Sequence, residues 1–359
     1  MTPQGQTAAA LIAGADPKLA RPAIAGVAVR TPTISCQPLT QAAGSEVALK
    51  AECLQATGSF KLRGALCKVA ALGERADAGL VTASAGNHGR AVAHAARVRG
   101  VGCEVIMPLD ASVSKVAAVQ RLGARVQLEG ASVEDALQLA AERGEQTGAA
   151  FVHPFDDLDV IAGQGTLGLE LLEDVPDLAR VIVPVGGGGL ASGIGVALRG
   201  AGANAQLVGV QASACAPYAR ALEGGSRSVG EEPPTSATIA DGIAIKRPGE
   251  LTLPLLRELL RSLVTVAEDE IAEAMVFLAE NAKLVAEGAG AVAVAALLSG
   301  RLEPVKGSTV AIVSGGNVDS GLLAGLLLAM KARRAGGCAC SRACPTVPGV
   351  SPSSSTSSR

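Results

Sequence analysis

An excess of charge of either sign is absent from this sequence. Its 359 residues carry 31 Lys and Arg against 33 Asp and Glu, for a formal net charge of -2. Phosphate backbones and acidic membrane surfaces attract proteins through a basic excess, so we expect neither nucleic acid nor a membrane as a partner. Aromatic residues are also scarce, with no Trp, one Tyr and four Phe. Because aromatic residues are so rare, one that adjoins a reactive side chain is conspicuous.

Long apolar runs are missing as well. The most membrane-like segment, residues 322–330, is too short to cross a bilayer, and we expect it to form a buried helix. The N-terminus lacks the basic cluster and compact apolar run of a secretory signal. Five of the eight cysteines are widely scattered, which excludes a disulfide framework and favours a reducing cytoplasm. They are Cys36, Cys53, Cys67, Cys103 and Cys215.

What the chain does contain is a large apolar fraction in an alternating arrangement. Hydrophobic residues make up 48% of the sequence and the mean hydropathy is +0.36, which allows a large core and about two domains. Val- and Ile-rich runs alternate with Ala- and Leu-rich helical stretches. This pattern is typical of a parallel sheet covered on both faces and predicts an α/β fold. The expected strands are residues 80–82, 104–107, 125–128, 181–185, 207–210 and 310–313.

The two ends depart from this pattern. Residues 1 to about 30 show no strong period and are predicted to form an N-terminal arm. Residues 335–359 are rich in Gly, Cys, Ser and Pro and are predicted to be disordered. Three cysteines of this tail, Cys338, Cys340 and Cys344, have no histidine nearby to complete the four ligands of a closed zinc site. We therefore predict no metal site.

One lysine has an unusual setting. Lys61 lies in the run Ser59-Phe60-Lys61-Leu62-Arg63-Gly64-Ala65, next to one of the few aromatic rings. A lysine held against apolar surface loses its proton more readily, and only the neutral amine attacks a carbonyl to form a Schiff base. Taken alone, a lysine is more often a solvated surface charge, so the other motifs must decide between the two interpretations.

Four consecutive glycines follow the strand expected at residues 181–185. They are Gly186, Gly187, Gly188 and Gly189. A turn without Cβ atoms at a helix N-terminus lets successive N–H groups approach an anion. The turn also fits the dinucleotide pattern G-x-G-x-x-A, but the next strand ends in Gln211 instead of an acid that would hold ribose hydroxyls. No Gly-Lys-Ser/Thr follows, which excludes a P-loop, so the turn favours a single phosphate monoester.

Two further turns follow predicted strands. The turn Ser84-Ala85-Gly86-Asn87-His88 begins an Ala-rich helix, so its N–H groups can receive a carboxylate and Asn87 can hydrogen-bond a ring hydroxyl. We assign His88 no catalytic role, because a histidine at a helix start is often a structural hydrogen-bonder. In the turn Ser314-Gly315-Gly316-Asn317, either Ser314 faces a ligand at the carboxyl end of the sheet or the glycines serve the turn geometry alone.

These segments, in this order, resemble the fold type II pyridoxal-phosphate (PLP) enzymes, and most closely the threonine/serine dehydratase and serine racemase branch. The resemblance covers about residues 30–330 and rests on the Lys61 run, the two Ser-containing turns and the four glycines. Residues 151–157, 162–166 and 239–242 are also similar to segments of this branch.

The resemblance implies a role for each motif. Lys61 would bind PLP as a Schiff base and later act as general base at Cα, with Phe60 near the ring and Asn87 on its 3'-oxygen. The four glycines would hold the 5'-phosphate, Ser314 would face the pyridine nitrogen, and residues 84–88 would bind the substrate. A neutral hydroxyl stabilises a pyridinium less than an aspartate does, which favours expulsion of a β-hydroxyl over transamination. The implied reaction converts L-threonine to 2-oxobutanoate and ammonia, and L-serine to pyruvate and ammonia.

Other activities remain open beside this one. Serine racemase is the first alternative, but serine racemases have a hydroxyl at the position of Ala85. That branch also has carboxylates for a divalent cation where Gln211 and Pro217 stand, which puts a cation requirement in doubt. A dehydratase of hydroxyaspartate or phenylserine is a second alternative, although the apolar residues 243–245 tilt towards threonine. A phosphate-binding module without chemistry is a third.

The resemblance also implies an architecture. Residues 1–75 and 159–334 would form a larger domain, residues 76–158 a smaller domain inserted into it, and PLP would lie in the cleft between them. The smaller domain would close on the substrate. Homo-oligomers are usual in the family. Only a short polar tail follows Lys331, so no C-terminal effector domain and no feedback control through one are expected.

Overall fold

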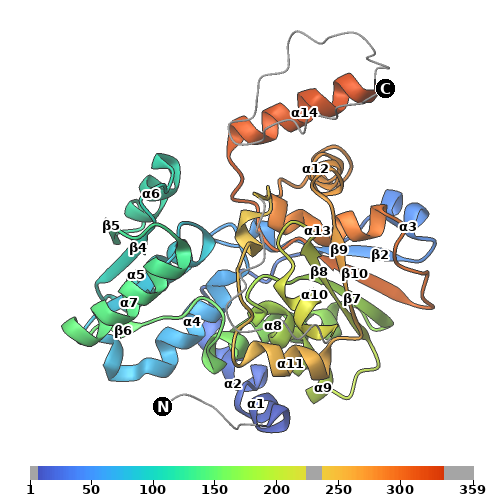
Figure 1. Ribbon diagram of the computed structural model, residues 1–359. Helices are drawn as coiled ribbons and strands as arrows, with labels where there is room; N and C mark the ends of the chain where they lie inside the picture. Colours follow the sequence, from blue (N-terminus) through green and yellow to red (C-terminus); the bar gives the residue numbers. More distant parts are fainter. Residues whose placement is uncertain (1–6, 224–236, 335–359) are drawn as a thin grey trace.

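Two separate sheets organise this chain. The computed structural model describes residues 7–223 and 237–334 (Figure 1). The larger sheet has the order β1-β2-β10-β7-β8-β9, and within it only β1 and β2 pair antiparallel. The smaller sheet has the order β5-β4-β3-β6 and is parallel throughout. The α/β fold predicted from the alternating pattern is confirmed.

All six strands expected from the sequence form, within a few residues of the predicted bounds. They are β3 (Leu80–Ala83), β4 (Cys103–Met107), β5 (Arg125–Leu128), β7 (Leu178–Pro184), β8 (Gln206–Ala212) and β10 (Ser308–Ile312). Four further strands were not expected, namely β1 (Thr33–Ser35), β2 (Val47–Lys50), β6 (Ala150–Phe151) and β9 (Ser262–Val266). These are edge strands or short, partly polar strands, so they lack the continuous apolar run of a central parallel strand.

Helices cover both faces of the two sheets. The α-helices are α1 (Ala8–Gly14), α2 (Pro17–Ile24), α3 (Gln37–Ala43), α4 (Lys61–Leu72), α5 (Asn87–Arg99), α6 (Val113–Gln120), α7 (Val133–Thr147), α8 (Leu158–Asp174), α9 (Gly189–Gly200), α10 (Pro217–Leu222), α11 (Thr252–Leu259), α12 (Glu268–Phe277), α13 (Gly288–Leu298) and α14 (Ser320–Arg334). Because side chains alternate along a strand, Ile182 of β7 packs with α12 and α13 while Val181 and Val183 pack with α8 and α9.

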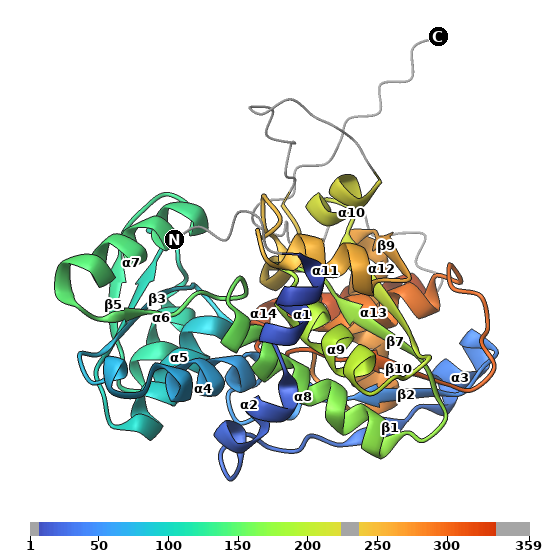
Figure 2. The same ribbon diagram turned by 90° about the horizontal axis from the view of Figure 1, so that it is seen from below.

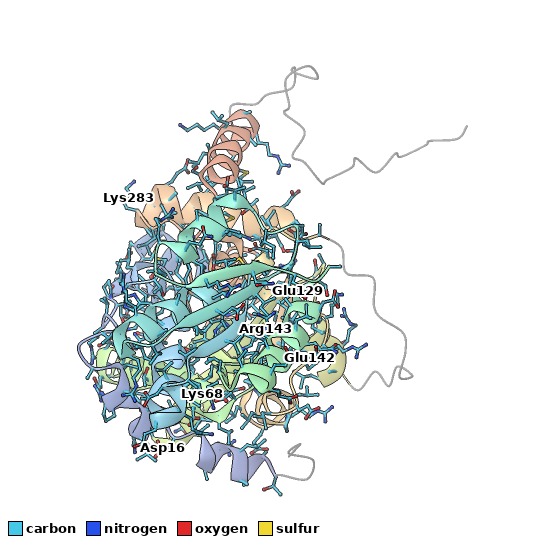
Figure 3. All side chains as sticks on the ribbon, turned by 90° about the vertical axis from the view of Figure 1, so that its left-hand side faces the viewer. Asp16, Lys68, Glu129, Glu142, Arg143 and Lys283 are labelled. Atoms are coloured by element: carbon cyan, nitrogen blue, oxygen red, sulfur yellow. The ribbon has the colours of Figure 1, made fainter. Side chains whose placement is uncertain are left out.

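The smaller sheet is layered in the same way. Val81 and Ala83 of β3 pack against α7, and Leu80 packs on the side of α4 and α5. Arg143 of α7 ties this helix to the sheet, since one guanidinium nitrogen lies 2.9 Å from Glu104 of β4 and another lies 3.9 Å from Glu129 (Figure 3).

The expected N-terminal arm is wrong in its described part. Residues 8–24 form α1 and α2, and Figure 2 shows them against the underside of the larger unit, near α8 and α11. Leu11 and Ile24 are buried in one cluster with residues of α4 and α8. Neither helix is long enough to display several apolar repeats, which explains why no period was visible in the sequence.

The segment expected as a buried helix forms α14 but is not buried. Leu328 is 69% exposed, and Figure 1 shows α14 extending beyond α12, away from both sheets. Leu326 is only partly buried against the core around α13. Within the described residues, no helix is both long enough and apolar enough to span a bilayer. Residues 335–359, predicted to be disordered, and their three cysteines lie outside the described part of the chain.

Candidate active site

The Lys61 segment and the Ser314 turn lie side by side. Ser59 forms an isolated antiparallel bridge with Gly315, and the Phe60 N–H donates to the Ser314 carbonyl oxygen at 3.1 Å. Lys61 is the first residue of α4, and Ser314 follows β10 at the carboxyl end of the larger sheet. Open α/β sheets bind ligands at this end.

The Lys61 amine is held in apolar surroundings. Its Nζ donates to the Pro154 carbonyl oxygen at 2.7 Å and lies 5.3 Å from the centre of the Phe60 ring. Burial lowers the pKa of Lys61 to about 8, against an opposing effect of the charge on Glu287. A lysine with this pKa has a larger neutral fraction near pH 7 than a solvated lysine, and the neutral amine is the form that attacks a carbonyl.

The four-glycine turn contacts Phe155, the residue that follows Pro154. Phe155 has its ring against Gly187 and its backbone against Gly189, so a Cβ at Gly187 would overlap the ring. A continuous series of contacts therefore connects the Lys61 amine, through Pro154 and Phe155, with the glycine turn. The structure brings together two motifs that are more than a hundred residues apart in the sequence.

The glycine turn presents unpaired donors. Within residues 7–223 and 237–334, the N–H groups of Gly186 to Gly189 have no hydrogen-bond acceptor, and the first N–H of α9 that bonds back to the turn is that of Ser192, to the Gly188 carbonyl. Gly186 and Gly187 are only half-buried, and Gly188 has a φ of 88°, which favours glycine. Free N–H groups at the start of a helix form an anion site, and a phosphate monoester satisfies their chemistry.

The second Ser-containing turn places Asn87 in a chain of polar side chains. Asn87 Nδ2 donates to Glu287 Oε1 at 2.5 Å, and Asn87 Oδ1 accepts from Asn317 Nδ2 at 2.6 Å. Arg90 in turn donates to Asn317 Oδ1 at 2.5 Å. The Asn87 amide keeps one Nδ2 hydrogen for a further acceptor, such as a ring hydroxyl. Asn87 belongs to the segment of the smaller sheet, and Glu287 and Asn317 belong to the segment of the larger sheet. These hydrogen bonds therefore connect the two segments.

Glu287 is a site residue that the sequence analysis missed. It is 7% exposed, precedes α13, and its carboxylate would overlap a Cβ placed on Gly315. Burial raises the pKa of Glu287 to about 7, helped by repulsion from Asp241 and opposed by the Asn87 hydrogen bond. A signal was present, because Glu287 is the only charged residue between Lys283 and Arg301 in an otherwise small and apolar stretch.

The remaining expected residues surround the same space. Ser314 is buried, and its Oγ donates to the Ala289 carbonyl oxygen at 3.4 Å, two residues from Glu287. Ser84, Ala85 and Gly86 are half-buried and lead into α5. His88 is buried with its Nε2 3.0 Å from the Val152 carbonyl oxygen, and burial lowers its pKa to about 3, so the ring is neutral at pH 7.

Together these groups suit an aldehyde that carries a phosphate. Lys61 supplies the amine, the glycine turn supplies free N–H donors, and Asn87 and Ser314 supply neutral hydrogen-bonding groups between them. A separate cavity of about 620 Å³ lies at the amino ends of β2 and β10, and none of the expected site residues lines it. The candidate site lies instead at the carboxyl end of the larger sheet, beside Ser314.

Comparisons with known proteins identify the family. Residues 24–315 match the family described as pyridoxal-phosphate dependent enzyme. An L-threonine ammonia-lyase of Thermotoga maritima is 47% identical over 86% of this chain and 76% of its own, and the catabolic L-threonine dehydratase TdcB of Escherichia coli is 43% identical over 76% and 83%.

Solved structures agree on the fold. A threonine deaminase from T.th. has a TM-score of 0.78 at 40% identity, covering 85% of this chain and 98% of that one. A maize serine racemase has a TM-score of 0.81 at 34% identity, covering 90% and 99%. The fold type II architecture that the sequence resemblance implied is confirmed.

Proposed function

This chain belongs to the pyridoxal-phosphate dependent enzyme family, and we propose that it is an L-threonine ammonia-lyase that also accepts L-serine. The observation that carries the proposal is Lys61, an amine with a pKa of about 8. Pro154 and Phe155 connect it to a glycine turn whose N–H groups have no acceptor in the described part of the chain. The curated relatives with 43–47% identity that act on threonine support the substrate.

The residues present fit PLP. Lys61 would hold its aldehyde carbon, the N–H groups of residues 186–189 its phosphate, Asn87 its 3'-oxygen and Ser314 its ring nitrogen. When bound, PLP supplies an electron sink that acidifies the Cα–H of the substrate. Ser314 would offer the ring nitrogen a neutral hydroxyl, which would weaken that sink and favour loss of a β-hydroxyl.

The chain's own groups perform the remaining tasks. The Lys61 amine, released when the substrate amine takes its place, would accept the Cα proton. The N–H groups at the start of α5, in the segment of Ser84, Ala85, Gly86, Asn87 and His88, would bind the substrate carboxylate. Closure of the smaller-sheet segment would exclude water from the site. We further propose residues 76–158 as the closing domain and a homo-oligomer as the working form.

Ala85 stands where the resemblance to serine racemases calls for a hydroxyl, and its methyl group cannot donate a proton to Cα, which disfavours racemisation. The test is to incubate the PLP-loaded protein with L-threonine and with L-serine. We expect 2-oxobutanoate and pyruvate to form, with no turnover by Lys61→Ala and little D-serine. D-serine as the dominant product from L-serine, or no oxo acid from either substrate, would refute the proposal.

A further inference from the structure

Two buried side chains hold carbonyl oxygens at the glycine turn, one on Val185 just before the turn and one on Gly187 within it. Gln211 of β8 is fully buried, and its Nε2 donates to the Val185 carbonyl oxygen at 3.0 Å. Tyr218 of α10 is also fully buried, and its hydroxyl donates to the Gly187 carbonyl oxygen at 2.8 Å. Both therefore contact the turn from the β8–α10 segment, at alternate peptide groups.

These contacts fix the direction of the turn's N–H groups. In a planar trans peptide the C=O of one residue and the N–H of the next point in opposite directions. Holding the Val185 carbonyl against Gln211 therefore directs the Gly186 N–H away from Gln211. Holding the Gly187 carbonyl against Tyr218 likewise directs the Gly188 N–H away from Tyr218. Both N–H groups are among those that have no acceptor within residues 7–223 and 237–334.

Each of the two side chains is itself held in place. Gln211 Oε1 accepts from the Ala219 N–H at 3.0 Å, which fixes the amide so that its NH₂ faces Val185. The Tyr218 oxygen accepts from the Gly249 N–H at 3.0 Å and lies 2.6 Å from Thr252 Oγ1. With the tyrosine proton on the Gly187 carbonyl, the Thr252 hydroxyl has two acceptors within reach, the Tyr218 oxygen at 2.6 Å and Asp156 Oδ1 at 3.3 Å.

The surroundings of Tyr218 are anchored from a third element. Asp156 accepts from the N–H groups of Glu250, Leu251 and Thr252 at 2.8–3.1 Å, at the start of α11. A Cβ at Gly188 would lie 2.9 Å from both the Tyr218 hydroxyl and Thr252 Cβ, so the turn packs directly on this pair. Burial raises the pKa of Tyr218 to about 12, which keeps its hydroxyl protonated as a donor.

We propose that Gln211 and Tyr218 are positioning residues that preorganise the glycine turn for a phosphate dianion, and that they thereby set the preference of this site for PLP over its unphosphorylated form, pyridoxal. The inference rests on the proposed placement of the phosphate at residues 186–189. Neither residue would touch the cofactor. Each acts through a peptide group whose N–H does.

The test compares two ligands that differ only in the phosphate. The full-length protein is dialysed against graded concentrations of PLP or pyridoxal, and occupancy is read from the visible absorbance of the covalently bound cofactor. We expect Tyr218→Phe, which removes one hydroxyl, to raise the PLP dissociation constant about five- to tenfold, the factor that corresponds to one buried hydrogen bond. The pyridoxal dissociation constant should stay within about twofold of wild type, because pyridoxal has no phosphate to sense the turn.

Two further variants sharpen the test. Gln211→Met keeps the side-chain length without the donor and should show the same selective loss, which also covers the case that Tyr218→Phe does not fold. Ser299→Ala is the matched control, because its hydroxyl also donates to a backbone carbonyl, that of Ala296, but at the far end of α13. This control should leave both dissociation constants unchanged.

Two results would overturn the inference. One is an unchanged PLP dissociation constant in Tyr218→Phe and Gln211→Met, and the other is an equal weakening of PLP and pyridoxal. Failure of the proposed function looks different. If wild type binds PLP but forms no oxo acid from threonine, the reaction is wrong and this test still stands, whereas absence of a visible band in wild type refutes the cofactor placement itself.

Discussion

Arg63→Met should destabilise this protein far more than Arg21→Met, because the two arginines pair with carboxylates in opposite environments. Arg63 lies two residues after Lys61 and is fully buried, with its guanidinium 2.8–2.9 Å from Glu52 and 2.7–3.0 Å from Glu170. Arg21 makes a 2.6 Å pair with Glu173, in which both side chains are roughly half exposed, at 50% and 42%.

The size of the difference follows from what each substitution leaves behind. Without Arg63, the fully buried Glu52 keeps the Thr31 hydroxyl as its only side-chain donor among the described residues, and Glu170 keeps Lys50 at 2.8 Å. Removing one partner of a buried pair costs about 3–5 kcal/mol, since a charge is left without compensation. An exposed pair contributes about 0–1 kcal/mol. The same Arg→Met change should therefore differ by about 2–5 kcal/mol between the two positions.

The difference should also depend on pH. Burial alone would raise the pKa of Glu52, but the charge and hydrogen bonds of Arg63 outweigh it and hold the pKa below its usual value. A lowered pKa contributes stability above the ordinary glutamate pKa of about 4.3, and this stability is lost as the pH falls through the folded-state value. In Arg63→Met the buried Glu52 prefers its neutral form, so the gap to wild type should narrow between pH 7 and pH 4.

Urea denaturation of wild type and both variants, followed by circular dichroism at pH 7 and pH 4, measures these quantities. Equal destabilisation by Arg63→Met and Arg21→Met at pH 7 would show that the buried ion pairs of Arg63 contribute no more than the exposed pair of Arg21. A gap between Arg63→Met and wild type that widens on acidification would contradict the expected pH dependence.

Three other predictions concern the site. Gly315→Ala should lower kcat/KM for threonine about tenfold or more, because the new Cβ would overlap the Glu287 carboxylate. Gly325→Ala is the control, since a Cβ at Gly325 meets open space and should leave kcat/KM unchanged. Equal kcat/KM values for the two variants would contradict this prediction. The pKa of Glu287 is raised to about 7, so the folded state loses stability as the pH rises from about 4.3, the ordinary glutamate pKa, through 7. Glu287→Gln removes this titration and should be more stable than wild type by on the order of 2 kcal/mol at pH 8, but not at pH 5. Thermal denaturation at both pH values measures the difference. Lys115 of α6 lies 2.6 Å from Asp241 and pairs the smaller-sheet segment with the larger one, so the ion pair should stabilise the closed arrangement that holds the substrate. Lys115→Met should therefore raise KM for threonine about two- to fivefold at low salt but not at 1 M NaCl, where the charges are screened. An effect that does not depend on salt would exclude an electrostatic contribution of this pair.

The central strands and the chemical motifs could be read from the sequence because their signals are local. A continuous apolar run marks β7, and four glycines directly after it mark a turn whose backbone must lie open. Lys61 stands out through its aromatic neighbour. Each of these features depends on a few adjacent residues, so no tertiary contact was needed to find it.

The contacts that organise the site could not be read in the same way. Gln211 is conspicuous in the sequence only as a residue that is not acidic, and its bond to Val185 appears only when β8 lies beside β7. Tyr218 is the only tyrosine, but nothing local indicates that it reaches Gly187. For α14, the apolar sequence indicated a helix correctly, yet burial depends on a partner surface that sequence periodicity does not contain.

We propose that Lys61 carries the cofactor, and borohydride reduction of the PLP-loaded protein, followed by peptide mass spectrometry, identifies the lysine that does. Lys50 and Lys68 are the informative competitors, since both are at least partly buried but paired with carboxylates, whereas Lys61 donates only to a carbonyl oxygen among the described residues and has a pKa of about 8. We expect a single pyridoxyl-phosphate adduct, on the peptide that contains Lys61. An adduct on any other lysine, with Lys61 unmodified, would contradict it.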